Sequence, residues 1–298
     1  MRLQGKTVIV TGGGSGFGEG IAKTFAREGA NVVVNDLNGP AAERVASEIA
    51  LASSPEAAHG RAIAVQGDVT KREDWQKLHD AAIQDFGSVQ IVVNNAGTTH
   101  RNKPVLEVTE AEFDRVYAVN VKSISWSVEQ FVPYFREQGG GAFLNIASTA
   151  GVRPRPGLVW YNGSKAAVII ASKALAVELG TDRIRVNCIN PVMGETALLS
   201  EFMGMEDTPE NRRKFLATIP LGRFSTPQDV ANAALYLASD DAEFISPASR
   251  SKWTADGVSE LQACAPCHGC GARSASGLPL AKTSVWRRGQ TARILTRL

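Results

Sequence analysis

Short apolar runs that alternate with amphipathic stretches are the feature that most narrows the folds open to this chain. The runs are rich in Val and Ile and lie at 7–11, 31–36, 61–68, 89–96, 141–148 and 184–190. Stretches with helical periodicity separate them, at 17–28, 40–52, 71–86, 111–137 and 162–179. Nearly all-apolar strands that alternate with helices indicate a parallel sheet with helices on both faces. We therefore predict an α/β fold with a doubly wound, mostly parallel, Rossmann-like sheet, in a single domain over residues 1–245.

Charge and cysteine content indicate which partners and which cellular compartment suit this domain. The chain of 298 residues has a formal net charge of +2, but residues 246–298 hold eight Lys/Arg against two Asp/Glu. The first 245 residues are therefore mildly acidic, which argues against a nucleic-acid partner. Cys188 is the only cysteine among them, as is typical of a reducing cytoplasm. The start has the wrong flanks for a signal peptide and no run approaches the roughly 18 apolar residues of a membrane span, so we expect a cytoplasmic protein without a membrane partner.

A glycine-rich octapeptide, Thr11 to Gly18, follows the first predicted strand and precedes a helix. Glycines let the backbone adopt positive φ and approach a pyrophosphate, whose negative charge a helix N-terminus favours. The alternative is a glycine-rich turn that binds nothing, but the position between strand and helix favours a dinucleotide. The predicted cofactor contacts in this loop are Gly12, Ser15, Gly16, Phe17 and Gly18.

Two acidic residues follow the second and third predicted strands. Asp36 lies 20 residues beyond Gly16, where a carboxylate accepts hydrogen bonds from both adenosine ribose hydroxyls and repels a 2′-phosphate. No Arg or Lys lies in the glycine-rich loop or directly after Asp36, so we predict NAD rather than NADP as the cofactor. Asp68 and Val69 would lie beside the adenine. For both acids the alternative is a turn-forming Asp at the end of a strand.

Tyr161 and Lys165 lie one turn apart on a predicted helix, and therefore on one face. A tyrosine acts as a base near neutral pH only if its pKa falls well below about 10, and a neighbouring ammonium favours that shift. The alternative is an exposed Tyr/Lys pair, but Ser148 ends a strand 13 residues earlier, where crevice residues belong. Asn120, among apolar residues of a long helix, is either a hydrogen-bonded core amide or a residue that holds a water. We predict Asn120, Ser148, Tyr161 and Lys165 as the catalytic residues, and no metal.

Taken together, these residues resemble the short-chain dehydrogenases/reductases. The resemblance covers residues 3–245 and rests on Thr11-Gly12-x-x-x-Gly16-x-Gly18, Asp68, Asn94-Asn95-Ala96-Gly97, Asn120, Ser148, Tyr161-x-x-x-Lys165 and Pro191. The joint order and spacing of these motifs are far more specific than any one of them. Val192 follows Pro191 where the family commonly has glycine, so the path of the next loop is open.

The resemblance implies a role for each matched residue. Tyr161 would be the general acid/base, Lys165 would lower its pKa and hold the nicotinamide ribose, and Ser148 would orient and polarise the substrate oxygen. Asn120 would position a water in a proton relay from Lys165. Further cofactor contacts would come from Asn94, Ala96, Gly97, Pro191 and Thr196, the last of these bonding the carboxamide. The family also implies assembly as a homotetramer.

Residues 192–218 correspond to the variable segment that covers the substrate in this family. Its apolar side chains would wall a pocket or simply pack a short helix, chiefly Phe202, Met203 and Met205. Arg153 and Arg155 could meet an acidic substrate, although solvated arginines are the more common case. The residues do not name a substrate.

From residue 246 on, the sequence changes character. The alternation stops, and three of the four cysteines of the chain appear within seven residues. One permitted back-translation of residues 246–260, regrouped after its first two bases, reads Thr-Gly-Val-Ala-Leu-Glu-Val-Asp-Gly-Gly-Arg-Cys-Ile and then a stop. That reading resembles the usual last strand and ending of the family. We therefore predict that 246–298 is an out-of-frame tail, produced by one inserted base, which replaces the last strand of a 258-residue enzyme and impairs its homotetramer.

Four tail residues carry metal-ligand chemistry, namely Cys264, Cys267, His268 and Cys270. The first three have the C-x-x-C-H spacing of c-type haem attachment, and the set has the residue types of a zinc site. Neither a haem fold nor an export signal accompanies them, so we assign them no function.

Three functions remain in view. The leading one is an NAD-dependent oxidoreductase that transfers a hydride between NAD(H) and a small secondary alcohol or ketone. A second is a 3-oxoacyl-[acyl-carrier-protein] reductase, a branch that usually prefers NADPH, so that Asp36 counts against it. The third, of another class, is a catalytically impaired frameshift product that only binds nucleotide.

Overall fold

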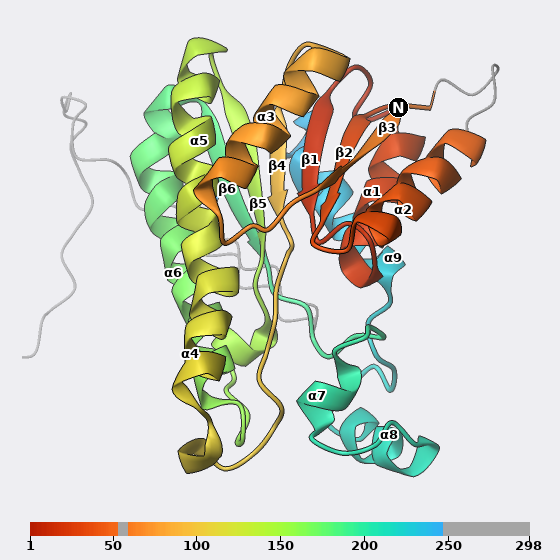
Figure 1. Ribbon diagram of the computed structural model, residues 1–298, viewed down its shortest axis with the longest axis vertical. Helices are drawn as coiled ribbons and strands as arrows, with labels where there is room; N and C mark the ends of the chain where they lie inside the picture. The colour runs from red at the N-terminus through yellow and green to blue at the C-terminus, as the bar shows by residue number, and fades with distance from the viewer. Residues whose placement is uncertain (53–58, 247–298) are drawn as a thin grey trace, which may run out of the picture. The chain divides into compact units, whose positions relative to one another are not determined.

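The computed structural model describes residues 1–52 and 59–246. Its strands are β1 (Thr7–Thr11), β2 (Asn31–Asp36), β3 (Ala62–Gln66), β4 (Ile91–Asn94), β5 (Gly141–Ile146) and β6 (Ile184–Ile189). In the described residues they form one six-stranded sheet of order β3-β2-β1-β4-β5-β6, in which every neighbouring pair is parallel (Figure 1). The strand order reverses between β1 and β4, which opens a crevice at their carboxyl ends. The predicted doubly wound, Rossmann-like α/β fold is confirmed.

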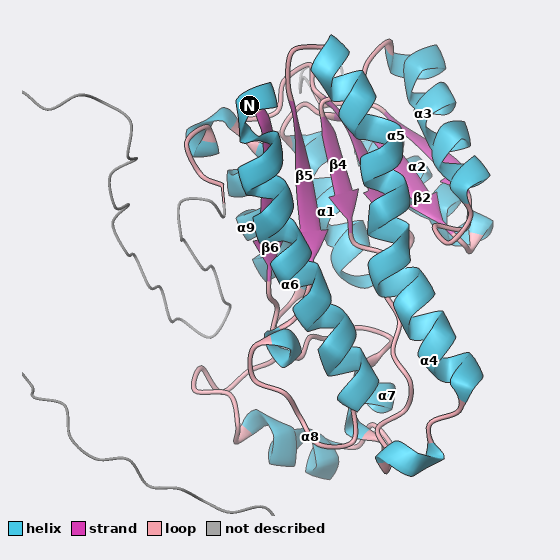
Figure 2. Ribbon diagram, turned by 90° about the vertical axis from the view of Figure 1, so that its left-hand side faces the viewer, coloured by secondary structure: helices cyan, strands magenta, loops and turns pink. Residues whose placement is uncertain are grey.

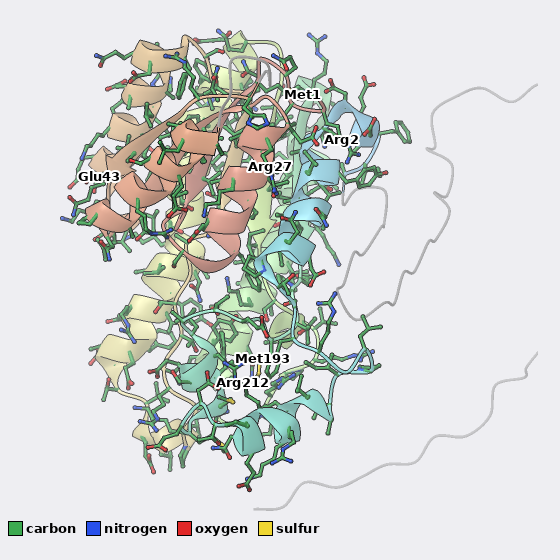
Figure 3. The ribbon with its side chains drawn as sticks, turned by 90° about the vertical axis from the view of Figure 1, so that its right-hand side faces the viewer. Met1, Arg2, Arg27, Glu43, Met193 and Arg212 are labelled. Carbon is green, nitrogen blue, oxygen red and sulfur yellow. The ribbon has the colours of Figure 1, made fainter. Side chains whose placement is uncertain are left out.

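Helices cover both faces of the sheet because successive strand residues point to opposite sides. On one face, Val8 and Val10 pack in a core under α1 (Gly16–Arg27), α2 (Gly39–Ala52) and α9 (Pro227–Ala238). On the other face, Ile9 and Val33 pack under α3 (Arg72–Phe86), α5 (Ser123–Glu137) and α6 (Val159–Leu179). Figure 2 shows α5 and α6 in front of the strands, and Figure 3 shows α9 beside α1, which carries the labelled Arg27. Burial on both faces explains why the strands are apolar runs rather than alternating ones.

The helix predicted over 111–137 is interrupted. α4 (Glu110–Tyr117) runs into a π-helical turn at Ala118–Lys122, and α5 continues from there. Such turns often mark functional sites, and this one carries the predicted Asn120, which is 2 % exposed.

The segment 192–218 folds beyond the carboxyl ends of the strands, as Figure 1 shows. It contains α7 (Leu199–Met203) and α8 (Pro209–Leu216), with Met193 and Arg212 labelled in Figure 3. A small apolar cluster holds it together, formed by Met193, Leu199, Met203, Ile219 and Phe224. The segment therefore has a core of its own and does not lie on the surface as a loose loop.

Within the described residues β6 is an edge strand. The side-chain amide of Asn187 on β6 donates to the carbonyl of Ile245 at 2.9 Å, close to the last described residue. The predicted tail, from Pro247 on, lies outside the described residues, as do Cys264, Cys267, His268 and Cys270. None of the described helices combines the length and the apolar character needed to cross a membrane.

Candidate active site

A cavity of about 510 Å³ opens at the carboxyl ends of the strands. It is lined by fourteen of the residues predicted as cofactor contacts or catalytic groups: Gly12, Ser15, Gly16, Phe17, Asp36, Asp68, Val69, Ala96, Gly97, Ser148, Tyr161, Lys165, Pro191 and Thr196. Gly18, Asn94 and Asn120 do not line it. One cavity therefore joins the glycine-rich loop to the Tyr161 pair.

At several of its glycines the glycine-rich loop has no room for a side chain. Gly12 and Gly16 have positive φ angles of 60° and 54°. Gly18 lies behind the loop, where a Cβ atom would come within 2.1 Å of the Gly12 carbonyl oxygen. The loop ends at the first turn of α1, whose backbone N–H groups have no partner within the helix. This arrangement is what a bound pyrophosphate requires.

An ion-pair network that the sequence reading missed lies against this loop. The Arg44 guanidinium donates to the Gly14 carbonyl at 2.9 Å and pairs with Glu19 at 2.7 Å and Glu48 at 2.8 Å. Lys23 pairs with the same two glutamates, at 2.5 Å each. The hydrogen bonds that Arg44 donates to Glu19 and Glu48 raise its pKa. Because both cations are already paired, neither is free to hold a 2′-phosphate.

Asp36 is half-buried at the end of β2. Its Oδ2 accepts a hydrogen bond from the Gly14 backbone N–H at 2.9 Å, and its Oδ1 accepts one from Asn38 N–H at 3.0 Å. A carboxylate has about four acceptor positions, so two bonds leave capacity for ligand hydroxyls. The carboxylate thus fixes the loop and faces the cavity with negative charge.

Asp68 makes the turn that the alternative reading described, and it lines the cavity as well. Its Oδ1 accepts from the backbone N–H of Thr70 at 2.9 Å and from the Thr70 hydroxyl at 2.8 Å. The carbonyl of Val69 accepts from the Trp75 indole at 3.0 Å, which anchors this turn on α3. Both residues are therefore held at the cavity wall by local hydrogen bonds.

Tyr161 and Lys165 are buried side by side on α6, at 6 % and 5 % exposure. The Lys165 Nζ donates to the Ile146 carbonyl at 2.8 Å and lies 6.0 Å from the centre of the Tyr161 ring. Burial raises the pKa of Tyr161 to about 12, against the effect of its hydrogen bond with Ser148. Burial also lowers the pKa of Lys165 to about 8.

The predicted direction of the Tyr161 shift is therefore wrong for this structure. Desolvation of the phenol outweighs the lowering effect of Ser148, so the pKa of Tyr161 rises instead of falling. At neutral pH Tyr161 is a neutral phenol, which is the form that donates a proton to a carbonyl oxygen.

Asn120 is a fully engaged core amide. Its Oδ1 accepts from Thr98 N–H at 2.8 Å, and its Nδ2 donates to the Thr98 carbonyl at 2.9 Å and to the Ser164 hydroxyl at 3.0 Å. These bonds are those of a core amide, and the role of Asn120 in positioning a water stays a prediction. Asn120 holds the strand-end loop against α6 next to Gly97, where a Cβ atom would lie 3.4 Å from Lys165 Nζ.

Asn95 occupies the place predicted for Asn94. Asn94 is 6 % exposed and donates to Asn145 within the sheet, whereas Asn95 lines the cavity. The Asn95 side chain donates to the carbonyls of Thr11 at 2.8 Å and Gly12 at 3.0 Å. Asn94 is the last residue of β4 and Asn95 follows it at the cavity, so Asn95 is the better placed of the two, and a cofactor contact from Asn94 stays a prediction.

Asn102 is a second residue that the sequence reading missed. Its side chain donates to the carbonyls of Pro156 and Phe202, each at 3.2 Å, and its backbone N–H donates to Glu201 at 2.9 Å. It thereby joins three segments that are far apart in the chain: the loop after β4, the loop after β5, and α7. No motif surrounds it that could have signalled this role.

Beside Tyr161 the cavity has several apolar walls. Leu158, Met193 and Phe202 line it, and the Phe202 ring lies 5.0 Å from that of Tyr161. Of the other apolar residues proposed as pocket walls, Met203 is buried in the segment's own cluster and Met205 is 37 % exposed, and neither lines the cavity.

Comparison with known proteins places this site in a family. The model of a family described as enoyl-(acyl carrier protein) reductase matches residues 12–249. A 4-formylbenzenesulfonate dehydrogenase of Comamonas testosteroni is 54 % identical over 82 % of this chain and 95 % of its own length. A 7alpha-hydroxysteroid dehydrogenase of Escherichia coli K12 is 39 % identical over 83 % of this chain and 92 % of its own length.

A solved structure is similar as well. The 3-ketoacyl-(acyl-carrier-protein) reductase of Brucella melitensis, crystallised with NADH, is 44 % identical, with a TM-score of 0.74 over 82 % of this chain and 95 % of its own. These matches confirm the family predicted from the motifs. The chain belongs to the short-chain dehydrogenases/reductases and is an oxidoreductase of that family.

Proposed function

We propose that this protein interconverts a small secondary alcohol and its ketone with NAD(H), and that Tyr161 exchanges the proton. The enzyme is an NAD(H)-dependent oxidoreductase. The observation that carries the residue roles is the single cavity that Tyr161, Ser148 and Lys165 share with the Asp36 carboxylate.

The residues present fit NAD(H). The loop before α1 has no room for side chains at Gly14 or Gly18, and it offers unpaired N–H groups to a pyrophosphate. Asp36 supplies acceptors for the adenosine ribose hydroxyls, and Lys165 and Thr196 lie along the same cavity toward the nicotinamide end. When bound, NAD(H) accepts or supplies the hydride.

The residues of the chain itself handle the proton. Ser148 and Tyr161 both line the cavity, so a substrate oxygen placed against both hydroxyls is held and polarised. In reduction, the neutral Tyr161 donates its proton to that oxygen. In oxidation, Tyr161 must first lose its proton, and the adjacent Lys165 ammonium stabilises the phenolate that results.

Replacement of Tyr161 by Phe tests this proposal. Because general acid/base catalysis typically contributes 10²- to 10⁴-fold, we expect Tyr161→Phe to lower kcat at least about a hundredfold while NADH still binds, as fluorescence titration would show. Tyr117→Phe is the matched control, since Tyr117 does not line the cavity. A kcat within about tenfold of wild type on a panel of secondary alcohols would reject the role of Tyr161.

A 3-oxoacyl-[acyl-carrier-protein] reductase is the second candidate. It is favoured by the Brucella structure, whose title names that activity. The negative charge of Asp36 and the paired state of Arg44 disfavour NADPH, the cofactor that this branch usually prefers. Comparison of NADH with NADPH, using an acyl-carrier-protein substrate and simple ketones, separates the two. A chain that binds NADH but turns over neither class would support the impaired-product alternative.

We further propose a cytoplasmic homotetramer. Enzymes of this family act on small-molecule substrates. Ile170 and Val177, on one face of α6, are 62 % and 68 % exposed, and exposed apolar residues of this kind commonly mark contact surfaces. Light scattering after size exclusion measures the assembly directly, and a monomer would refute it.

We also propose that the catalytic domain ends near residue 245 and that 246–298 is the product of one inserted base. The family match ends at residue 249, and the similar proteins cover 82 to 83 % of the chain. Resequencing of the gene across codons 235–262 tests this. An extra base relative to close homologous genes supports the frameshift, and an intact homologous frame contradicts it.

A further inference from the structure

The charged residues of the cavity are segregated. Its acidic lining residues, Asp36 and Asp68, follow β2 and β3 at one side of the sheet. Its cationic ones, Arg115, Arg155 and Lys165, come from α4, the loop after β5 and α6. Among the described lining residues, none on this second side is an Asp or a Glu.

Arg155 differs from the other two cations because its guanidinium has no hydrogen-bond acceptor among the described residues, whereas Arg115 and Lys165 each donate to a backbone carbonyl. The residue is half-buried, and burial lowers the pKa of its guanidinium. No described residue forms a hydrogen bond or an ion pair with that guanidinium. Arg185, whose pKa burial also lowers, instead donates to the carbonyls of Leu237, Ala238 and Ser239. A half-buried cation without an acceptor is costly, so such groups are normally paired.

The backbone at Arg155 is held in place. The Asn162 side chain donates to the Arg155 carbonyl at 2.8 Å, and Asn102 donates to the next carbonyl, that of Pro156. The neighbouring cavity walls, Leu158 and Phe202, are apolar. A guanidinium carried on a held backbone at the edge of an apolar chamber is suited to an oxyanion on a mainly apolar molecule, because its donors match a carboxylate in bidentate geometry.

We propose that Arg155 binds an anionic group of the substrate, so that the preferred substrates are small apolar carbinols or ketones that carry a carboxylate or a similar oxyanion. This inference rests on the proposed function, since it names the substrate class of the same site. Arg115 is a weaker candidate because it is exposed and its guanidinium already donates to the Thr99 carbonyl at 3.2 Å.

A binding measurement tests the inference independently of turnover. The full chain with saturating NAD⁺, which has no hydride to give to a ketone, is titrated in a calorimeter with 4-acetylbenzoate and with its neutral amide, 4-acetylbenzamide. We expect the anion to bind at least about tenfold more tightly, since a charge-assisted bidentate contact is available to it alone. Equal dissociation constants, or no binding of either compound, would overturn the inference.

Variants assign the effect to Arg155. Arg155→Gln should reduce the preference for the anion to less than about threefold. Arg155→Lys should keep only part of the wild-type preference, because an ammonium lacks the planar pair of donors of a guanidinium. Arg153→Gln is the matched control: it removes the same charge two residues away, from an exposed residue that does not line the cavity. An equal loss of anion preference in both Gln variants would mean that the positive charge of this region, and not a contact with Arg155, attracts the anion, which would refute a specific contact.

Turnover separates the two proposals. The oxidation of 1-(4-carboxyphenyl)ethanol is compared with the oxidation of its carboxamide, and KM and kcat are determined separately for each alcohol. Anion-selective binding without any turnover would leave Arg155 as the anion site and reject the proposed reaction. Turnover of both alcohols with equal KM would keep the reaction and reject Arg155.

Discussion

The buried ammonium of Lys165 should make the wild-type protein less stable than a variant that lacks it. The side chain is 5 % exposed, and burial lowers its pKa from 10.5 to about 8. Its one protein acceptor among the described residues is the Ile146 carbonyl at 2.8 Å. Lys165→Met keeps a side chain of similar length, removes the charge, and leaves that carbonyl without its donor.

The magnitude follows from the two pKa values. At about 1.4 kcal/mol per pH unit, the difference between 10.5 and about 8 corresponds to roughly 3 kcal/mol against the folded state, present in full below pH 8. Loss of the donor to Ile146 costs the variant about 2 kcal/mol. At pH 7 we therefore expect Lys165→Met to be more stable by about 1 kcal/mol.

This advantage should disappear as pH rises. Between pH 8 and 10.5 the unfolded chain holds the Lys165 proton while the folded protein releases it, so the free energy of unfolding of the wild type rises with pH. By a pH of about 9.5 the penalty has fallen by roughly 2 kcal/mol, and the variant should be less stable than the wild type by about 1 kcal/mol.

Urea unfolding of both proteins at pH values of about 7 and about 9.5, followed by tryptophan fluorescence at one protein concentration, measures the difference. The cost of the orphaned carbonyl is the same at both pH values, so the change between them isolates the ammonium. A difference in unfolding free energy that stays constant between the two would refute the reasoning. Catalysis should be lost in the variant at both.

Three further predictions concern binding. Gly18→Ala should weaken NADH binding at least about tenfold in a fluorescence titration, because its Cβ would lie 2.1 Å from the Gly12 carbonyl; Gly180→Ala, with nothing within 4 Å, should not. Asp36→Ala should lower the ratio of kcat/KM with NAD to kcat/KM with NADP at least about tenfold, and an unchanged ratio would show that the carboxylate does not select the cofactor. Asn102→Ala should raise the KM for substrate several-fold, a larger factor than its decrease in kcat, because α7 and the loop after β5 both lose their hydrogen bond to Asn102. A change in Tm alone would show that Asn102 is a purely structural residue.

The fold was predictable because its determinants are local and repeated. The central strands are apolar runs that are buried on both faces, as the two cores on either side of β1 show. The interruption of the long helix was not predictable, because the π turn at Ala118–Lys122 accompanies bonds from Asn120 to a loop more than 20 residues earlier in the chain. Propensity and periodicity contain no information about such a partner.

The site was predictable where its residues lie at fixed offsets from a strand or helix. Asp36 follows β2, and Tyr161 and Lys165 share one face of α6, so spacing alone brings them to the crevice. Arg44 and Asn102 reach the same site through tertiary contacts with Gly14 and Phe202, and neither belongs to a motif. Their roles depend on which segments meet in space.

The pKa of Tyr161 shows most clearly what spacing leaves out. An i, i+4 pair predicts that an ammonium lies near the phenol, and it does, 6.0 Å from the ring centre. Burial opposes the effect of a nearby ammonium, because loss of solvation disfavours the phenolate, and here both groups are almost fully buried. Desolvation acts on the two groups in opposite senses, raising the pKa of Tyr161 to about 12 and lowering that of Lys165 to about 8. The protein alone thus holds a neutral proton donor, the Tyr161 phenol, beside an ammonium whose pKa is lowered, a pairing that the spacing of the two residues does not reveal.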